Sequence, residues 1–331
     1  MSSFSETAKK IAETYAVVED EFYPSGSVIF DAVIGGGIPK GSYVEIASES
    51  GLGKSTAALH FCKLICAKGK KAVYMDHEQA VNSSQVRGIG LEDFLGKNFL
   101  LLRPISFEDA EKVIETFAKE QDIAYIIIDS ITAMLPEKLL GKSVSEIEPG
   151  LHARYASQFL LKYKSLARKS GITFIFINQM RTKFNFRGVS RQEAAGGNAQ
   201  KFYMDVRLQM DLEKRLDKVQ NTVEGTETVP YGAHVKVWTV KNRYERPFIP
   251  GVATIIYGKG ISNISAYSRW MEKKGFFKVG NGGWNTVSFN GKEDKVRGEK
   301  GFMEWVRANS KEVKEYIEAN GGFLLVEDTE E

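Results

Sequence analysis

The segment from Ser48 to Ser55, with the sequence SESGLGKS, has the residue types and spacing that bind a nucleotide phosphate. A glycine-rich turn between a strand and a helix directs backbone N–H groups at phosphate oxygens. In such a P-loop, Lys54 reaches the β- and γ-phosphates and the Ser55 hydroxyl binds Mg²⁺. The segment departs from the motif at its first position, where Ser48 replaces glycine and its Cβ is expected to restrict the turn. We predict a nucleoside triphosphate site formed by Ser48, Glu49, Ser50, Gly51, Leu52, Gly53, Lys54, Ser55 and Thr56.

Carboxylates at the ends of two apolar runs could complete a hydrolytic site. Asp129 ends the run YIIID, about 75 residues beyond the P-loop. An acid at the carboxyl end of a buried strand beside a P-loop orients Mg²⁺ and its waters, so we predict Ser55 and Asp129 as the metal-binding residues. Asp76 and Glu78 follow the run VYM. On spacing alone, either could polarise the water that attacks the γ-phosphate.

The segments that must position these residues alternate between strand and helix. We predict strands at 42–47, 71–76, 123–129 and 173–179, and helices at 54–67, 107–119 and 150–170. Runs such as AYIIID and TFIFIN are continuously apolar, which is typical of strands buried on both faces of a parallel sheet. After residue 206 the strands have short connections, which predicts antiparallel additions at the sheet edge. A small mixed segment follows and is predicted to end in one helix at 301–319.

The composition excludes several classes of protein. The chain has 331 residues, of which 43% are hydrophobic and 26% charged, so a long disordered or fibrous protein is excluded. No run approaches the roughly 18 apolar residues of a membrane helix, and the N-terminus lacks the apolar core of a signal peptide. Cys62 and Cys66 lie one helical turn apart, and we expect both to be reduced core residues. Because the net charge is only +3, a polyanionic partner would have to bind local cation clusters.

A set of segments in a fixed order carries a more specific resemblance. The set comprises SGSVIFDAVIGGGIPKGSYVEI, the P-loop, MDHEQA, IIIDSITAM, FIFINQMR, GGNAQKFY, VKNR and YGKGI. On these segments, residues 24 to about 320 resemble the RecA family of homologous-recombination proteins, in a bacterial or phage-encoded form. The resemblance implies an α/β fold with a RecA-like P-loop ATPase core at 24–264, whose central sheet is mostly parallel with antiparallel edge strands. It also implies a short helical polymerisation arm at 1–23, a small α+β C-terminal domain at 265–326 and a short acidic tail at 327–331.

The resemblance also implies roles around the nucleotide, which is expected to be ATP with Mg²⁺. Glu78 corresponds to the general base that activates water, and Gln179 corresponds to a sensor of the γ-phosphate. Lys241 and Arg243 match two basic residues that reach the nucleotide of an adjacent protomer, where a cation stabilises charge on the transferred phosphate. Together with Lys54, these residues form the predicted catalytic set.

Two loops, at 139–149 and 182–195, are expected to hold DNA. The second loop interleaves three cations with two phenylalanines, so that cations could bind phosphates while rings stack on bases. The predicted DNA-binding residues are Arg154, Ser157, Arg181, Thr182, Lys183, Arg187, Arg191, Gly196, Gly197 and Asn198. Gln85 replaces a family tyrosine that stacks on adenine, and Asn82 replaces a neighbouring aspartate, so the mode of base recognition stays open.

These expectations combine into one function with two alternatives. The predicted protein is an ATP- and single-stranded-DNA-dependent recombinase that forms a helical filament, with Phe202 at the protomer interface, and pairs the bound strand with homologous duplex DNA. A single-strand-binding protein and loading mediators are further candidate partners, and no membrane is expected. We expect a cytoplasmic, nucleoid-associated protein in a bacterial or phage-infected cell. The alternatives are a ring-forming RecA-fold helicase or repair ATPase, and an ATP-switched scaffold that does not bind DNA.

Overall fold

The structure, a computed structural model of the chain, describes residues 20–141, 150–184, 190–194, 201–222, 225–320 and 322–323. Of residues 181–184, 190–194, 220–222 and 225 it describes the backbone. The predicted arm lies almost wholly outside the described residues, as do the acidic tail and most of the first DNA loop. Among the residues that the structure describes, no helix is long and apolar enough to cross a membrane.

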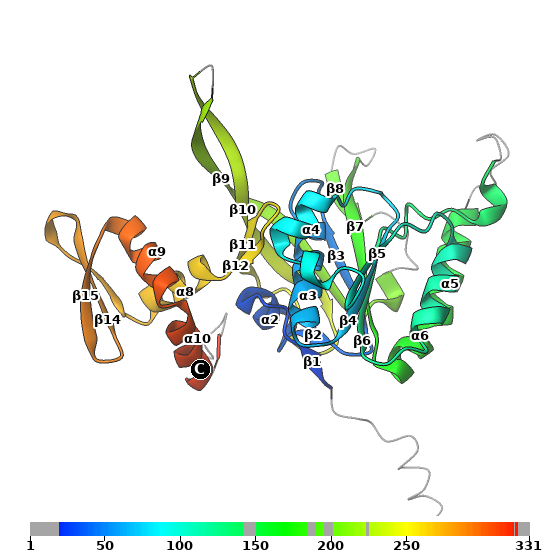
Figure 1. The fold of residues 1–331 in the computed structure, drawn as a ribbon, viewed down its shortest axis with the longest axis horizontal. Helices are drawn as coiled ribbons and strands as arrows, with labels where there is room; N and C mark the ends of the chain where they lie inside the picture. The colour runs from blue at the N-terminus through cyan, green and yellow to red at the C-terminus, as the bar shows by residue number, and fades with distance from the viewer. Residues whose placement is uncertain are drawn as a thin grey trace, which may run out of the picture.

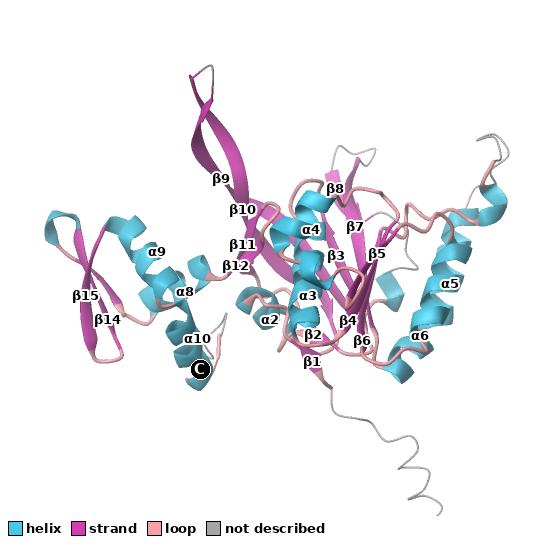
Figure 2. Cartoon of the chain, in the orientation of Figure 1, coloured by secondary structure: helices cyan, strands magenta, loops and turns pink. Residues whose placement is uncertain are grey.

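A large sheet runs through the centre of the described chain (Figures 1 and 2). Its strand order is β12 (Gly260–Ser262), β11 (Gly251–Ile256), β10 (Gly225–Asn242), β9 (Val206–Thr222), β3 (Tyr43–Ser48), β7 (Thr173–Phe184), β6 (Ile123–Asp129), β4 (Lys71–Asp76) and β5 (Phe99–Leu102). The strands from β9 to β5 pair in parallel, and β10, β11 and β12 add antiparallel pairs. The predicted mostly parallel sheet with antiparallel edge strands is therefore confirmed.

Helices cover both faces of this sheet because alternate strand residues point to opposite faces. Val44 and Tyr74 pack in a cluster with α2 (Val28–Ile34), α3 (Lys54–Ala67) and α4 (Ser83–Ile89). Tyr43 and Val73, one residue earlier on the same strands, pack in a second cluster with α5 (Phe107–Phe117) and α6 (Leu151–Ser170). Cys62 and Cys66 are free and buried in the first cluster, as expected. The two apolar layers explain why the central strands read as continuous apolar runs.

Three strands, β7, β9 and β10, are longer than the sequence predicted. The predicted strand at 173–179 continues to Phe184 as β7, which pairs with the antiparallel strand β8 (Ser190–Ala194). The predicted loop at 182–195 is therefore wrong over its described residues, which form a hairpin. The alternation of Met180, Thr182 and Phe184 with polar residues is the period-2 signal that this strand carries. Strands β9 and β10 likewise continue beyond the sheet as a protruding two-stranded ribbon (Figure 1).

The remaining elements frame the core and build the C-terminal part. Short elements of the core are β1 (Phe22–Tyr23), β2 (Ile38–Pro39), η1 (Glu92–Phe94) and η2 (Glu137–Leu139). The C-terminal part contains α8 (Ile264–Lys273), β13 (Phe277–Val279), η4 (Asn281–Gly283), β14 (Trp284–Phe289), β15 (Lys292–Arg297), α9 (Gly298–Ala308) and α10 (Ser310–Ala319). It has its own apolar cluster, which includes Trp270, Phe302 and Ile317.

The single helix predicted at 301–319 is wrong, because α9 and α10 are separate helices. Asn309 stands between them, and its side-chain amide donates to the Trp305 carbonyl oxygen at 2.9 Å. The Asn309 N–H group still donates to the same carbonyl oxygen at 3.0 Å. The break is a departure of the Asn309 backbone from helical geometry, with φ −102° and ψ 16°.

Candidate nucleotide site

The P-loop lies between the end of β3 and the start of α3, at the carboxyl edge of the parallel strands. Gly51 and Gly53 have φ values of +79° and +85°, which side chains other than hydrogen disfavour. A Cβ on Gly53 would lie 2.7 Å from Cγ2 of Ile255. Both glycines are therefore needed for the turn to approach a ligand.

A cleft of about 310 Å³ opens over this turn. It is lined by Ser50, Gly51, Gly53, Lys54, Ser55, Thr56, Glu78, Ala80, Gln85, Asp129, Ile177, Gln179, Tyr257 and Gly258. The structure thus brings most of the predicted nucleotide residues to one cleft. Ser48, Glu49 and Leu52 do not line it. Ser48 ends β3, and its hydroxyl donates to the Glu49 carbonyl oxygen at 2.7 Å. Its φ is not positive, so a side chain is accommodated at this position without backbone strain.

Lys54 is the cation of the cleft and is held by the loop itself. Its side chain is only 8% exposed. The ammonium donates to the carbonyl oxygens of Glu49 and Ser48 at 2.8 and 3.2 Å, and to the Ser48 hydroxyl at 3.1 Å. Burial lowers the pKa of Lys54, and the charges of Asp129 and Glu78 oppose that shift. The serine at the first motif position therefore supplies a hydrogen-bond acceptor for Lys54.

Ser55 and Asp129 meet in the wall of the cleft. The Ser55 hydroxyl donates to Oδ2 of Asp129 at 2.8 Å, and the Tyr74 hydroxyl donates to the same oxygen at 2.5 Å. Burial raises the pKa of Asp129, and the charges of Glu78 and Asp76 raise it further. A divalent cation would offset this concentration of negative charge. A hydroxyl and a carboxylate oxygen match a magnesium ion that takes its other ligands from phosphates and water, so the residues present fit Mg²⁺.

The two candidate bases have different surroundings. Asp76 is fully buried, and its carboxylate accepts the N–H groups of Ala80 and Val81, each at 3.1 Å. Its role is to hold the chain after β4. Glu78, in contrast, is exposed and lines the cleft.

Glu78 is oriented by one residue that directly follows β6 and by another on β7. Its Oε1 accepts the Ser130 hydroxyl at 2.8 Å. The Gln179 amide nitrogen lies 3.3 and 3.4 Å from its two carboxylate oxygens. The residues predicted as base and sensor are therefore in direct contact.

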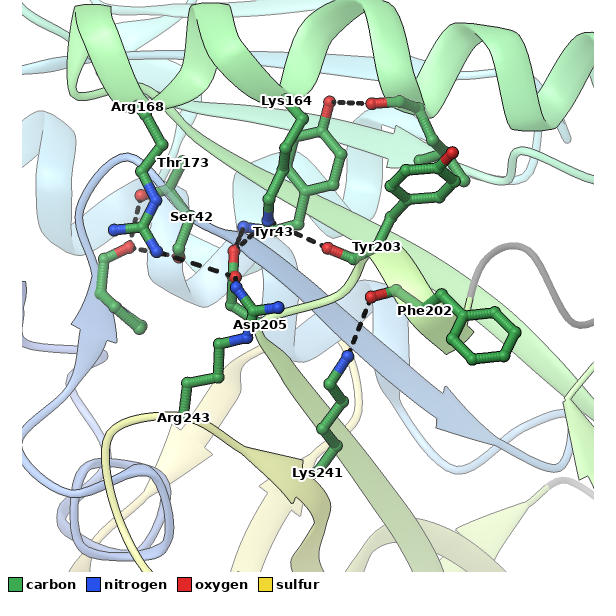
Figure 3. A network of polar contacts seen from close by, with 12 residues as sticks. Ser42, Tyr43, Lys164, Arg168, Thr173, Phe202, Tyr203, Asp205, Lys241 and Arg243 are labelled. Carbon is green, nitrogen blue, oxygen red and sulfur yellow. Dashed lines mark hydrogen bonds and ion pairs between the residues drawn. The ribbon is translucent and has the colours of Figure 1, made fainter.

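The structure does not bring the predicted cations Lys241 and Arg243 to the cleft of their own chain. Lys241 donates to the carbonyl oxygens of Phe202 and Lys201 at 2.9 and 3.2 Å, and Arg243 donates to Asp205 at 2.8 Å (Figure 3). Phe202 is 74% exposed beside them. The cations and the exposed ring share one surface, separate from the cleft.

The predicted DNA-binding residues are only partly described. Arg154 is exposed and Ser157 half-buried on the first turns of α6. Arg181, Thr182 and Lys183 lie on β7, where Lys183 pairs in register with Arg191 of β8. Arg187, Gly196, Gly197 and Asn198 lie outside the described residues. The hairpin begins directly beyond Gln179 on the same strand.

Several residues of the site were missed by sequence reasoning. Tyr74 and Ser130 position the two carboxylates through hydroxyl groups, and only the alignment of β4 with β6 brings them there. Tyr257, in the segment YGKGI, lines the cleft, although the sequence alone does not connect it to the nucleotide. Gln85 lines the cleft, but its side-chain oxygen also accepts the N–H group of Asn82 in a capping box at the start of α4.

Comparisons with known proteins support the same assignment. The family model for the RecA N-terminal domain matches residues 6–262. The chain is 33% identical over 271 residues to a protein named Protein RecA from Nostoc punctiforme, which covers 82% of this chain and 72% of that protein. It is 36% identical over 250 residues to Protein RecA from Chloroherpeton thalassium, and this match covers 75% of this chain and 67% of that protein. It is 30% identical over 298 residues to Protein RecA from Prochlorococcus marinus, and this match covers 90% of this chain and 74% of that protein.

The parallel sheet, the P-loop and the acids at the ends of β4 and β6 define a P-loop protein that binds nucleotide with a divalent metal. Within this class, the chain belongs to the RecA family. It is a recombinase of recombination and repair and, in general terms, a DNA-dependent ATPase. The ring-forming helicase is not favoured.

Proposed function

We propose that the chain hydrolyses ATP with Mg²⁺ at the interface between protomers of a filament on single-stranded DNA, and that it pairs this strand with homologous duplex DNA. The observation that carries the proposal is the course of β7. One strand carries Gln179, which contacts Glu78 in the cleft, and then continues into the hairpin with Arg181 and Lys183. A shift of the hairpin on DNA would therefore move the partner of the proposed base.

Within one protomer, the P-loop turn and Lys54 hold the phosphates. The fixed N–H groups of the turn and the helix start at Lys54 favour negative charge there. When bound, Mg²⁺ neutralises charge on the phosphates, and Ser55 and Asp129 would hold it. Glu78 accepts the proton of the attacking water, and Ser130 and Gln179 keep its carboxylate oriented. Tyr257 supplies an aromatic wall for the base in place of the family tyrosine.

Between protomers, Lys241 and Arg243 act on the nucleotide of the neighbour. Their position supports this proposal, because both lie away from the cleft of their own chain and beside the exposed Phe202 ring. A cation supplied across an interface stabilises charge on the transferred phosphate only after assembly. Hydrolysis then depends on the filament.

DNA binding would use repetition rather than bulk charge. Each protomer offers the β7–β8 hairpin and Arg154 on α6, and a filament multiplies these few phosphate contacts. We place the protein in the cytoplasm with the nucleoid, with a single-strand-binding protein and loading mediators as further partners.

The test is ATP hydrolysis with and without single-stranded DNA, for the wild type and Lys54→Ala, with electron microscopy of the same mixtures. We expect single-stranded DNA to stimulate hydrolysis by the wild type, and Lys54→Ala to be inactive. The wild type should form helical filaments. Hydrolysis that DNA does not stimulate, together with closed rings, would contradict the proposal.

A further inference from the structure

A buried carboxylate, Asp205, lies at the centre of the network that contains the proposed trans-acting cations (Figure 3). It stands just before β9 and is fully buried. Its backbone is locked to β3, because its N–H group donates to the Tyr43 carbonyl oxygen and its Oδ2 accepts the Tyr43 N–H group, both at 2.9 Å. β3 runs directly into the P-loop. A carboxylate this deeply buried requires charged partners and hydrogen bonds.

Three cations supply that pairing from two other segments. Lys164 of α6 forms an ion pair and hydrogen bond with Oδ2 of Asp205. From the same helix, Arg168 lies 3.8 Å from Oδ1. Nη1 of Arg243, just beyond β10, donates to Oδ1 at 2.8 Å. Three positive charges around one negative charge leave an excess of positive charge at this surface.

The same network holds the segment that carries Phe202. Lys164 also donates to the Tyr203 carbonyl oxygen at 2.9 Å, and its ammonium lies 4.3 Å from the centroid of the Tyr43 ring. Lys241 holds the Phe202 carbonyl oxygen from the other side. Residues 201–205, the exposed ring and the two proposed trans-acting cations thus form one connected unit.

The contact with Asp205 fixes the direction of the Arg243 guanidinium. The side chain is 51% exposed, so one end is anchored on a buried group while the other faces the surface. A guanidinium has five N–H donors in a rigid plane. Anchoring one of them orients the remaining donors, and such orientation before the reaction is what gives a charged group its catalytic effect.

We propose that Asp205 is a positioning residue for the reaction: it orients Arg243 toward the nucleotide of the neighbouring protomer and ties it to the Phe202 segment. This inference rests on the proposed trans role of Arg243. It predicts that Asp205 affects turnover through Arg243 and leaves nucleotide binding by its own protomer unchanged.

The test is a double-mutant cycle between Asp205→Asn and Arg243→Ala, which isolates the coupling of the two side chains. Asparagine keeps an acceptor for the Tyr43 N–H group and removes the charge. We expect Asp205→Asn to lower the DNA-stimulated kcat at least tenfold with less than a twofold change in KM and in the Kd for a fluorescent ATP analogue. In the Arg243→Ala background the same change should lower kcat by less than twofold. Hydrogen exchange of the peptide spanning residues 201–205 should be faster in Asp205→Asn.

A second variant guards against misfolding, because Asp205→Asn leaves the Lys164 ammonium without its buried partner. Asp205→Asn combined with Lys164→Met removes both charges of the pair and should give at least the same loss of kcat with a melting temperature above that of Asp205→Asn. The matched control is Lys162→Met on the same helix, whose ammonium pairs with Glu111 and Glu115 instead. This control should keep the wild-type kcat.

The outcomes separate the two levels of the proposal. If Arg243→Ala keeps full DNA-stimulated turnover, the trans role is wrong and the inference about Asp205 fails with it. If Arg243→Ala loses turnover but Asp205→Asn does not, the trans role stands and Asp205 has no positioning role. Equal losses from Asp205→Asn in both backgrounds would likewise show that Asp205 does not act through Arg243.

Discussion

The contact between Gln179 and Glu78 predicts that removing the Gln179 side chain uncouples hydrolysis from DNA. The Gln179 amide joins Glu78, the proposed base, to β7, the strand that continues into the hairpin. In Gln179→Ala the carboxylate keeps its bond from Ser130, so the base remains in the cleft but no longer responds to β7. Basal hydrolysis should therefore persist while DNA stimulation is lost.

The distances limit the size of this effect. A hydrogen bond to a charged group contributes about 1.5–3 kcal/mol, and at 3.3 and 3.4 Å these contacts are at the long end of the range. We therefore expect the lower end of this range, so if the bond acts only in the DNA-bound state, its loss lowers the stimulated kcat by about tenfold. The free energy of unfolding should change by no more than about 0.5 kcal/mol, because a partly exposed side chain away from the core contributes little.

The assay is steady-state phosphate release with and without single-stranded DNA, together with the Kd for nucleotide and thermal unfolding. Gln121→Ala is the matched control, because Gln121 is an exposed glutamine just before β6, at the opposite end of that strand from the cleft. The control should keep wild-type stimulation. Gln179→Ala with full DNA stimulation would refute the coupling through β7.

Three further predictions follow from the same site and from the core. Gly53→Ala should weaken nucleotide binding at least tenfold and lower the free energy of unfolding by about 1–3 kcal/mol. The control is Gly69→Ala, because Gly69 has a similar φ of +80° but no atom within 4 Å of its added Cβ. Calorimetry and nucleotide titration of both variants therefore separate the effect of the clash from that of backbone strain. Tyr257→Ala should weaken ATP binding by about 1–3 kcal/mol through lost stacking, whereas Tyr257→Phe should retain the wild-type affinity. If Tyr257→Ala binds ATP as tightly as the wild type, the ring does not contact the base. Burial raises the pKa of Asp31 from its ordinary 3.8 to about 6. Between these two pH values the folded state retains a proton that the unfolded chain releases. The free energy of unfolding of the wild type therefore falls by about 3 kcal/mol as the pH rises from about 4 to above 6. Asp31→Asn lacks this loss, and denaturation between pH 4 and pH 7 should show its stability relative to wild type increasing with pH; a constant difference would contradict the raised pKa.

Local motifs allowed much of the nucleotide site to be predicted. The bounds of α3, β4 and β6 agree with the sequence because apolar runs and the P-loop define them within a few residues. The choice between Asp76 and Glu78 could not be made from spacing, since both follow the same strand. The structure separates their surroundings by burying Asp76 under two backbone N–H groups and leaving Glu78 in the cleft.

Contacts between distant segments were beyond the sequence pattern. The Asp205 network joins residues 43, 164, 205 and 243, and no local periodicity relates them. Helices α4 and α2 and strand β5 were not predicted, because they have only 7, 7 and 4 residues and such short segments do not show a clear period. The break at Asn309 is a departure of one residue's backbone from helical geometry, which a helical periodicity does not reveal.

The central claim is that hydrolysis requires a nucleotide site from one protomer and cations from the next. The most direct measurement mixes Lys54→Ala with Lys241→Ala on single-stranded DNA and follows ATP hydrolysis. In a random equal mixture, about a quarter of the head-to-tail interfaces join an intact nucleotide site to intact cations. The account predicts that each variant alone is nearly inactive and that the mixture recovers about a quarter of the wild-type rate. A mixture no more active than the mean of the two variants would contradict the claim.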